Sequence, residues 1–242
     1  MKFEDIRKLQ QKKFRDEAGW YLLEGEHLVQ ELQKAAVQEP RLRASEIYVT
    51  GEHAGWRSQL GVHAITTRQM AQISETRTPQ GIVAVAPILP PAAPQEGERA
   101  IYLHEIQDPG NLGTILRTLA WFGKFRCLLS PDSVDLHNGK VVRASMGAIF
   151  HVPVEKDVPL DALSTRFRRL ACLDLQGESI TTPAFRECDC FIFGNEARGL
   201  PRAEVTALAA RPFAISGTGV MESLNVAAAV TACQYELARN PD

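Results

Sequence analysis

The amino-acid sequence predicts an α/β protein in two parts. Closely spaced prolines and charges at residues 88–99 interrupt all periodicity, and we interpret this stretch as a linker. Strand-like and helix-like stretches alternate over residues 100–242, which is typical of a parallel sheet covered by helices on both faces. Residues 1–87 mix shorter elements of both kinds. We therefore expect a small α/β domain at 1–87 and a larger parallel-sheet domain at 100–242.

Composition excludes several classes of protein. The chain has 242 residues, 45% hydrophobic and 23% charged, which is enough to bury a core and argues against disorder. No apolar run is long enough to span a membrane, and the charged residues 1–5 lack the apolar core of a signal peptide, so we expect a cytoplasmic protein. Five cysteines and scattered histidines predict neither a disulfide framework nor a metal site. A net charge of −2 gives no indication of a nucleic-acid partner.

The first part alternates helical spacing with short strand-like runs. In chain order we expect a helix at 3–14, a strand at 20–23, a helix at 27–36, a strand at 46–49, a helix at 67–73 and a strand at 81–86. The leading helix carries basic residues opposite Glu4 and Asp5. These are Lys2, Arg7, Lys8, Lys12, Lys13 and Arg15. They form a local stripe suited to phosphates, although a solvated charged face is the simpler alternative.

The second part contains the apolar runs expected of buried strands. These runs lie at 101–106, 126–129, 149–154, 170–175, 190–194 and 212–215, and the stretches between them supply the helices. Ligands of such folds bind beyond the carboxyl ends of the strands. Glycine, asparagine, glutamate and serine are concentrated at those ends in this sequence.

A first motif, at residues 104–123, follows the first of these strands. An Asp-Pro-Gly turn leads into a helix that we expect to start near Asn111, a good capping residue. Gly113 and Arg117 are four residues apart and share one face of the helix. Its apolar faces, which we expect to pack on the sheet, carry Leu112, Ile115, Leu116 and Leu119. Arg117 would then stand near the ligand edge, although a solvated arginine is the simpler alternative.

A second motif lies at residues 191–201. An apolar strand ends in Gly194, which permits close approach of another backbone or a ligand, and the carboxylate of Glu196 follows. An ordinary loop with Pro201 at the start of the next helix is the alternative.

A third motif, at residues 215–229, is a glycine-rich turn followed by an alanine-rich helix. We expect Ser223 to cap this helix, and its small residues to permit close packing. Gly217-Thr218-Gly219 is weak evidence for phosphate binding because the full glycine fingerprint is absent.

Together with residues 140–148, the three motifs resemble the SpoU/TrmH family of S-adenosylmethionine-dependent RNA ribose 2′-O-methyltransferases, and the resemblance spans residues 101–237. It implies a SPOUT-type α/β fold with a parallel sheet and a deep trefoil knot. Residues 21–32 likewise resemble the accessory RNA-binding domain of longer family members. Family members act as homodimers, and apolar residues of the last helix and of the Arg117 helix would suit such an interface.

The resemblance also implies roles for particular residues. Those matching the catalytic positions are Arg117, Asn111, Glu196, Ser223 and Asn225. S-adenosyl-L-methionine would lie in the knot, held around Gly194, Asn195, Gly199, Ile215, Leu224 and Asn225. RNA contacts would come from Lys8, Lys12, Lys13, Arg15 and Arg117. One departure is Ser216-Gly217, where the family usually has a Pro-Met-like pair, so the conformation of this loop is open.

Physical chemistry constrains these roles. A guanidinium stays protonated, so we expect Arg117 to bind the phosphate beside the target ribose, while Glu196 or that phosphate accepts the proton. No metal is needed for an in-line methyl transfer. We therefore expect methylation of a ribose 2′-hydroxyl in structured RNA, with rRNA favoured over tRNA. The alternatives are a catalytically silent RNA-binding or ribosome-assembly factor and, disfavoured by the missing fingerprint, a dinucleotide-dependent enzyme.

Overall fold

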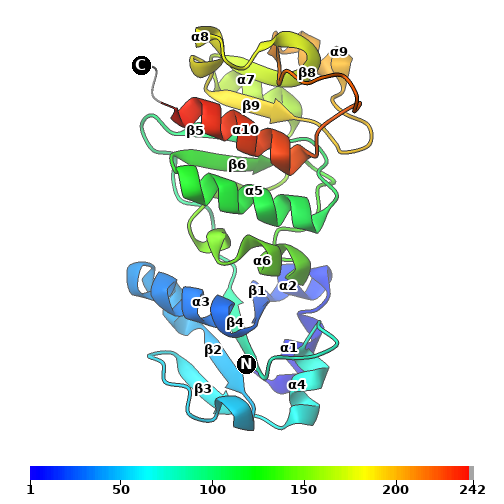
Figure 1. Cartoon of the computed structure of the whole chain (residues 1–242). Helices are drawn as coiled ribbons and strands as arrows, with labels where there is room; N and C mark the ends of the chain where they lie inside the picture. Colours follow the sequence, from blue (N-terminus) through cyan, green and yellow to red (C-terminus); the bar gives the residue numbers. More distant parts are fainter. Residues whose placement is uncertain (240–242) are drawn as a thin grey trace. The chain divides into compact units, whose positions relative to one another are not determined.

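The computed structural model describes residues 1–239, which form two compact units (Figure 1). The first unit contains Met1–Pro90 and also Asp135–Phe150. The second contains Pro91–Val134 and the chain from His151 onward. Within residues 1–239, no helix is long and apolar enough to cross a membrane.

The first unit is built on a four-stranded sheet in the order β1-β4-β2-β3. Its strands are β1 (Trp20–Glu24), β2 (Glu46–Val49), β3 (Gly61–Ala64) and β4 (Ile82–Pro87). Strand β4 runs antiparallel to both β1 and β2, whereas β2 and β3 are parallel. Its helices are α1 (Phe3–Lys8), α2 (Lys12–Ala18), α3 (Glu26–Gln38), α4 (Thr67–Ile73) and α6 (Gly139–Ser145), with short 3-10 turns at Pro40–Ala44, Gly51–His53 and Ala148–Phe150.

Alternating side chains of this sheet build two cores, one on each face. Leu23 of β1 packs with Leu32 of α3 and Val142 of α6. The neighbouring Leu22 packs on the opposite face with Ile6 of α1 and Met70 of α4. The small α/β sandwich expected from the sequence is therefore present.

Two elements of the first unit differ from the sequence prediction. The expected helix at 3–14 is two helices, because the chain leaves helical geometry between Lys8 and Lys12. Strand β3 was not predicted, because it has only four residues, all of them exposed, and these form no apolar run. It pairs with β2 as an edge strand of the sheet.

Residues 135–150 pack with the first unit, although the sequence division assigns them to 100–242. Val142 enters the core of the first unit, and Arg143 lies 3.5 Å from carboxylate oxygens of both Glu24 and Glu75. The Nε of Arg15 donates to Asp135 at 3.1 Å, and its Nη1 donates to the carbonyl of Leu9 at 2.8 Å. The two compact units are therefore not divided at a single point in the chain, because the first unit contains two separate stretches.

The second unit is built on a six-stranded sheet in the order β10-β8-β9-β5-β6-β7, with every pairing parallel. Its strands are β5 (Arg99–Leu103), β6 (Phe125–Leu129), β7 (Val154–Glu155), β8 (Leu170–Ser179), β9 (Cys190–Phe193) and β10 (Arg211–Ala214). Its helices are α5 (Pro109–Phe122), α7 (Leu163–Arg166), α8 (Pro183–Arg186), α9 (Arg202–Ala207) and α10 (Val226–Ala238), with a 3-10 turn at Leu160–Ala162. The predicted α/β class with a parallel sheet is confirmed.

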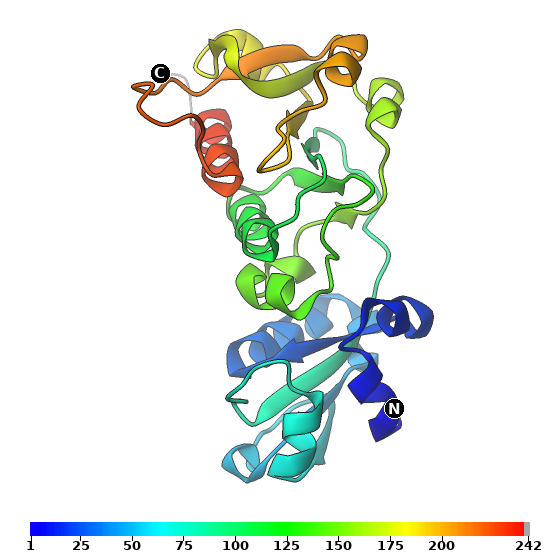
Figure 2. The same ribbon diagram turned by 90° about the vertical axis from the view of Figure 1, so that its right-hand side faces the viewer.

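Helices cover both faces of the second sheet. Helices α5 and α10 lie side by side on one face (Figures 1 and 2). Leu163 of α7 and Val205 of α9 join the core with Tyr102 and Ile192 on the other face. The predicted packing face of α5 is buried as expected, at Leu112, Ile115, Leu116 and Leu119.

The strand expected at 149–154 is instead a 3-10 turn followed by the two-residue β7. Phe150 and Ile149 pack with the core of the first unit, which takes this stretch out of the sheet. Strand β8 extends further than expected, to Ser179.

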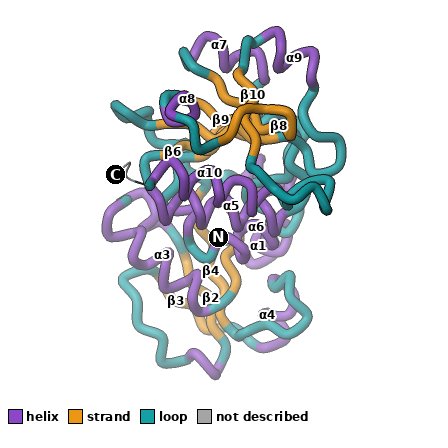
Figure 3. The backbone as a smooth tube through the Cα atoms, turned by 45° about the horizontal axis from the view of Figure 1, so that its top comes forward, coloured by secondary structure: helices purple, strands orange, loops and turns teal. Residues whose placement is uncertain are grey.

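Strand β10 crosses β8 closely at Gly177. The two strands lie side by side (Figure 3). Their pairing jumps from Pro212 opposite Cys172 to Phe213 opposite Glu178. A Cβ atom added at Gly177 would lie 2.3 Å from the nitrogen and 2.5 Å from the Cα of Phe213. Only glycine permits this approach of two backbones.

We expect Gly177→Ala to destabilise the protein by about 1–3 kcal/mol, because the backbone of Phe213 must move to admit the methyl group. Urea unfolding of the full chain measures the change. Gly217→Ala is the matched control, since nothing lies within 4 Å of a Cβ built there. Equal unfolding midpoints for the two variants would contradict the inferred crowding.

Candidate active site

Three loops leave the carboxyl ends of β5, β9 and β10, and their side chains form one hydrogen-bonded network. Glu196, after β9, accepts hydrogen bonds from the backbone N–H groups of Gln107 (3.2 Å) and Asp108 (3.1 Å). It also accepts one from the side-chain amide of Asn111, at 3.1 Å. The carboxylate therefore joins the loop after β9 to the start of α5 through hydrogen bonds.

Asn225 joins the third loop to the same network. Its Nδ2 donates to Oδ1 of Asn111 at 2.8 Å. Its Oδ1 accepts from the backbone N–H of Ala227 (2.9 Å) and of Ala228 (3.3 Å), which caps α10. The sequence motifs expected to form one site are thus brought together by Glu196, Asn111 and Asn225.

The N-terminal caps of α5 and α10 differ from the sequence prediction. Helix α10 is capped by Asn225 and not by Ser223, which is exposed. Helix α5 starts at Pro109, and its cap is Asp108, whose Oδ1 accepts from the backbone N–H of Asn111 at 2.8 Å. This arrangement leaves the side chain of Asn111 free to bridge Glu196 and Asn225.

The surroundings of Glu196 set its protonation. Burial acts to raise the pKa of this carboxyl, but hydrogen bonds from backbone N–H groups and from Asn111 together hold the pKa below its ordinary value. A carboxylate held ionised in this way is a weak proton acceptor. Its geometry is that of a positioning residue.

Asn195 is buried and holds the loop after β9 in place through its hydrogen bonds. Its backbone exchanges hydrogen bonds with Gly199 at 3.0 and 2.9 Å, and its Oδ1 accepts from the N–H of Ala197 and of Arg198. Its Nδ2 donates to the carbonyl of Glu105 at 2.7 Å. A Cβ at Gly194 would lie 2.4 Å from the carbonyl carbon of Gly199, so this turn requires glycine.

Arg117 lies in the third turn of α5 and is exposed. It makes no hydrogen bond or ion pair with any residue of the described chain, 1–239. An uncompensated guanidinium beside a strand-end site is available to an anionic ligand.

The remaining predicted residues of the third loop are outside the network. Ser223 and Leu224 are exposed, and Ile215 is partly buried at the end of β10. Within the described chain, residues 216–224 make no hydrogen bonds.

The predicted basic stripe of the first unit is only partly exposed. Lys8 pairs with Asp5 at 2.9 Å, while Lys12 and Lys13 pair more loosely with acidic residues four positions later. Exposed pairs of this kind are weak and exchange readily for phosphate. Arg15 is only 4% exposed and bound to Asp135, so the expectation that it belongs to an exposed stripe is wrong.

Sequence reasoning missed two residues of the site. Gln107 donates from its side chain to the carbonyls of Glu105 (3.1 Å) and Asp132 (2.7 Å), and Asp108 caps α5. The Asp-Pro pair at the helix start was the available signal, because Asp is a preferred cap and Pro a preferred first residue. No cluster of metal-binding side chains occurs in the described part of the chain.

Comparison with known proteins decides the family. Residues 98–235 match the SpoU rRNA Methylase family, and residues 2–84 match the MRM3-like substrate binding domain. The chain belongs to the SpoU rRNA methylase family. The resemblance noted in the sequence motifs is thereby confirmed.

One curated relative and two solved structures match this SpoU methylase over nearly the full length of both chains. It is 31% identical over 243 residues to the 23S rRNA (guanosine(2553)-2′-O)-methyltransferase RlmP of Bacillus subtilis, covering 98% of this chain and 95% of that one. An AdoMet-bound rRNA methyltransferase from Sinorhizobium meliloti superposes with a TM-score of 0.81 at 26% identity, covering 97% and 93%. AviRb from Streptomyces viridochromogenes, at 22% identity and a TM-score of 0.80 over 98% and 96%, shares the fold.

We expect Glu196→Gln to remove part of the acid sensitivity of this SpoU methylase. The pKa of Glu196 is lowered in the folded state, so its contribution to stability is present above the ordinary value of 4.5 and is lost as pH falls through the lowered value. The difference in unfolding free energy between wild type and variant should therefore shrink as pH drops below about 4.5.

Urea unfolding across this pH range measures the effect. Glu222→Gln is the control, because Glu222 is exposed and makes no hydrogen bond with residues 1–239. A difference between wild type and Glu196→Gln that stays constant with pH would refute the assigned role of the carboxylate.

Proposed function

We propose that this protein transfers the methyl group of S-adenosyl-L-methionine to a ribose 2′-hydroxyl of rRNA. The observation that carries the proposal is the network of Glu196, Asn111 and Asn225, which joins three motifs at one edge of the parallel sheet. Arg117, with no partner in the described chain, stands on the helix that this network anchors. Family membership and the rRNA methyltransferases among the relatives agree with this chemistry.

The loops around β9 and β10 fit the cofactor. Backbone groups of residues 216–224 have no hydrogen-bond partners in the described chain, and Met221 and Leu224 are 77% and 56% exposed. Exposed backbone polar groups beside apolar side chains suit a nucleoside. We assign binding to Gly194, Asn195, Gly199, Ile215, Leu224 and Asn225. The bound cofactor supplies a methyl group made electrophilic by its sulfonium.

Arg117 binds the phosphate next to the target ribose in this proposal. The guanidinium is permanently charged and offers a planar pair of donors that matches phosphate oxygens. It orients the ribose for in-line attack and stabilises the negative charge that develops on the 2′-oxygen. Its freedom from intramolecular partners leaves these donors available.

The proton of the 2′-hydroxyl passes to the RNA phosphate. The oxygens of Glu196 already accept three hydrogen bonds, from Gln107, Asp108 and Asn111, so we assign Glu196 to holding the loop and not to receiving this proton. Glu196 and Asn225 instead fix the loops that Arg117 and the cofactor require. Ser223 is free for a contact with the ligand or the RNA.

Domain roles and assembly complete the proposal. Residues 1–87 bind RNA, with Lys8, Lys12 and Lys13 as exposed cations, and residues 100–242 carry the chemistry after a linker at 88–99. The close approaches at Gly177 and Gly194 fit a trefoil knot formed by the last part of the chain. Trp121 and Tyr235, which are 85% and 62% exposed on α5 and α10, fit a homodimer contact.

Arg117→Ala should lower methyl transfer to rRNA by about 100-fold or more and leave S-adenosylmethionine binding intact, because only the RNA contact is removed. Transfer of labelled methyl groups to rRNA measures the first quantity, and calorimetry the second. Lys124→Gln removes an exposed cation elsewhere on the second unit and serves as the control.

Near-wild-type turnover of Arg117→Ala would overturn the role of this residue. Absence of cofactor binding to the wild-type protein at millimolar concentration would instead favour the silent RNA-binding alternative. Ribose-methylation mapping of RNA from cells that lack the protein would identify the nucleotide.

A further inference from the structure

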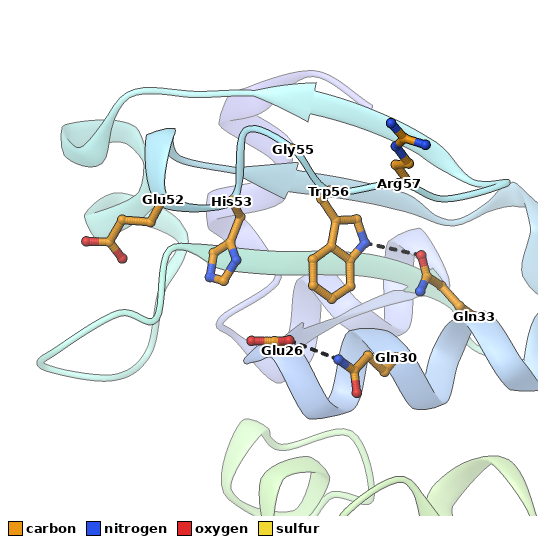
Figure 4. Close-up of a pocket in the computed structure, with 8 residues that line it drawn as sticks. All are labelled: Glu26, Gln30, Gln33, Glu52, His53, Gly55, Trp56 and Arg57. Carbon is orange, nitrogen blue, oxygen red and sulfur yellow. Dashed lines mark hydrogen bonds between the residues drawn. The ribbon is translucent and has the colours of Figure 1, made fainter.

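The first unit contains an open pocket between the start of α3 and the loop at residues 51–57 (Figure 4). Its volume is about 460 Å³, which is large enough for a heterocyclic base. Polar side chains surround a single indole, that of Trp56. Nothing in the proposed methyl-transfer chemistry uses these residues.

Gln80 hydrogen-bonds to both sides of the pocket, the loop at residues 51–57 and the start of α3. Its backbone carbonyl lies 2.7 Å from Nε2 of His53, and its side-chain Oε1 accepts from the backbone N–H of Glu26 at 3.2 Å. Gly25 makes this possible, since it has a φ of +106° and a Cβ there would lie 2.8 Å from the same Oε1. The pocket is therefore formed before any ligand arrives.

The indole of Trp56 is held as a rigid aromatic surface. Its Nε1 donates to Oε1 of Gln33 at 3.2 Å, and it packs against the core of the first unit. The ring of His53 lies edge-on to it, with centroids 5.9 Å apart. In Figure 4 the indole extends from its loop toward α3, with Glu26 and Gln30 beneath it.

Free donors and acceptors line the pocket around the indole. Nε2 of Gln30 donates to Oε1 of Glu26 at 2.9 Å, which leaves Oε1 of Gln30 and Oε2 of Glu26 as acceptors. Gln33 accepts from Trp56 through its oxygen, so its Nε2 remains a free donor. Arg57 makes no hydrogen bond or ion pair with residues 1–239. The pocket can thus satisfy a ligand edge that carries both donors and acceptors.

Charge selects the kind of ligand. Glu26 and Glu52 would repel a phosphate inside the pocket, whereas Arg57 offers one cation for it. An indole with amide and carboxylate groups suits an uncharged, planar heterocycle. A cationic side chain of a protein partner would also attract the carboxylates, but Arg57 and the two glutamines disfavour it.

We propose that this pocket binds one unpaired nucleobase of the substrate RNA, against Trp56, with its edge read by Gln30, Gln33 and Glu26 and its phosphate held by Arg57. The inference rests on the proposed function for the identity of the RNA as substrate. It assigns to the first unit the reading of a single-stranded nucleotide, since a paired base has neither its face nor its edge free.

The indole N–H signals of the full chain, labelled on its three tryptophans, test the pocket directly. A short single-stranded RNA should move the signal of Trp56, which the Trp56→Phe variant assigns, and the same RNA as a duplex should not. Gln30→Ala and Arg57→Ala should each weaken binding about fivefold. Matched controls are Gln38→Ala on the same helix and Arg68→Ala, both exposed outside the pocket and expected to bind normally.

The proposal would be overturned if single-stranded RNA did not shift the Trp56 signal, or if duplex RNA shifted it equally. It would also be overturned if only a lysine-rich peptide shifted that signal. Thermal melting of each variant shows that it is folded, and Gln30→Ala keeps the test valid if Trp56→Phe is unstable.

Methyl transfer separates this inference from the proposed function. In the rRNA assay, Gln30→Ala and Arg57→Ala should raise the KM for RNA about fivefold with kcat unchanged. If the wild-type protein transfers no methyl group but Trp56 responds to single-stranded RNA, the proposed function fails and the pocket stands. If rRNA is methylated while both variants show the wild-type KM, only the pocket assignment fails.

Discussion

The side-chain amide of Asn111 holds the candidate site together, because it donates to Glu196 and accepts from Asn225 at the same time. Its two partners lie 85 and 114 residues away along the chain. A carboxylate in this position could not donate to Glu196, and an apolar residue could do neither. The cap of α10 by Asn225 and the β9 loop meet at this amide, and Asp108, the cap of α5, accepts from the backbone N–H of the same residue.

The local pattern of apolar and polar residues in the sequence predicts the fold class and the positions of the motifs. Buried strands such as β9 are continuous apolar runs, and the buried face of α5 follows the helical spacing of its leucines. The exposed β3 has no such pattern. Ser223 and Asn225 are equally good caps by residue type, and the choice between them depends on Asn111, a contact that no local window contains.

Long-range pairing explains the other differences from the sequence prediction. Arg15 looks like one more cation of a basic helix, yet its partner Asp135 is 120 residues away and takes it out of solvent. Residues 135–150 look continuous with the second part, but Val142 and Arg143 find their contacts in the first. Counting charges or apolar residues along the chain cannot reveal which distant segment will supply a partner.

The crossing of β10 over β8 also sets an order of assembly. Strand β10 pairs with the earlier β8, and Asn225, the cap of α10, pairs with the much earlier Asn111. A chain folded only as far as β9 can pair β5 with β6 and β9, but it lacks Asn225 and therefore lacks the finished site. Formation of the candidate site therefore follows formation of the central strands, because Asn225 comes from a later segment of the chain.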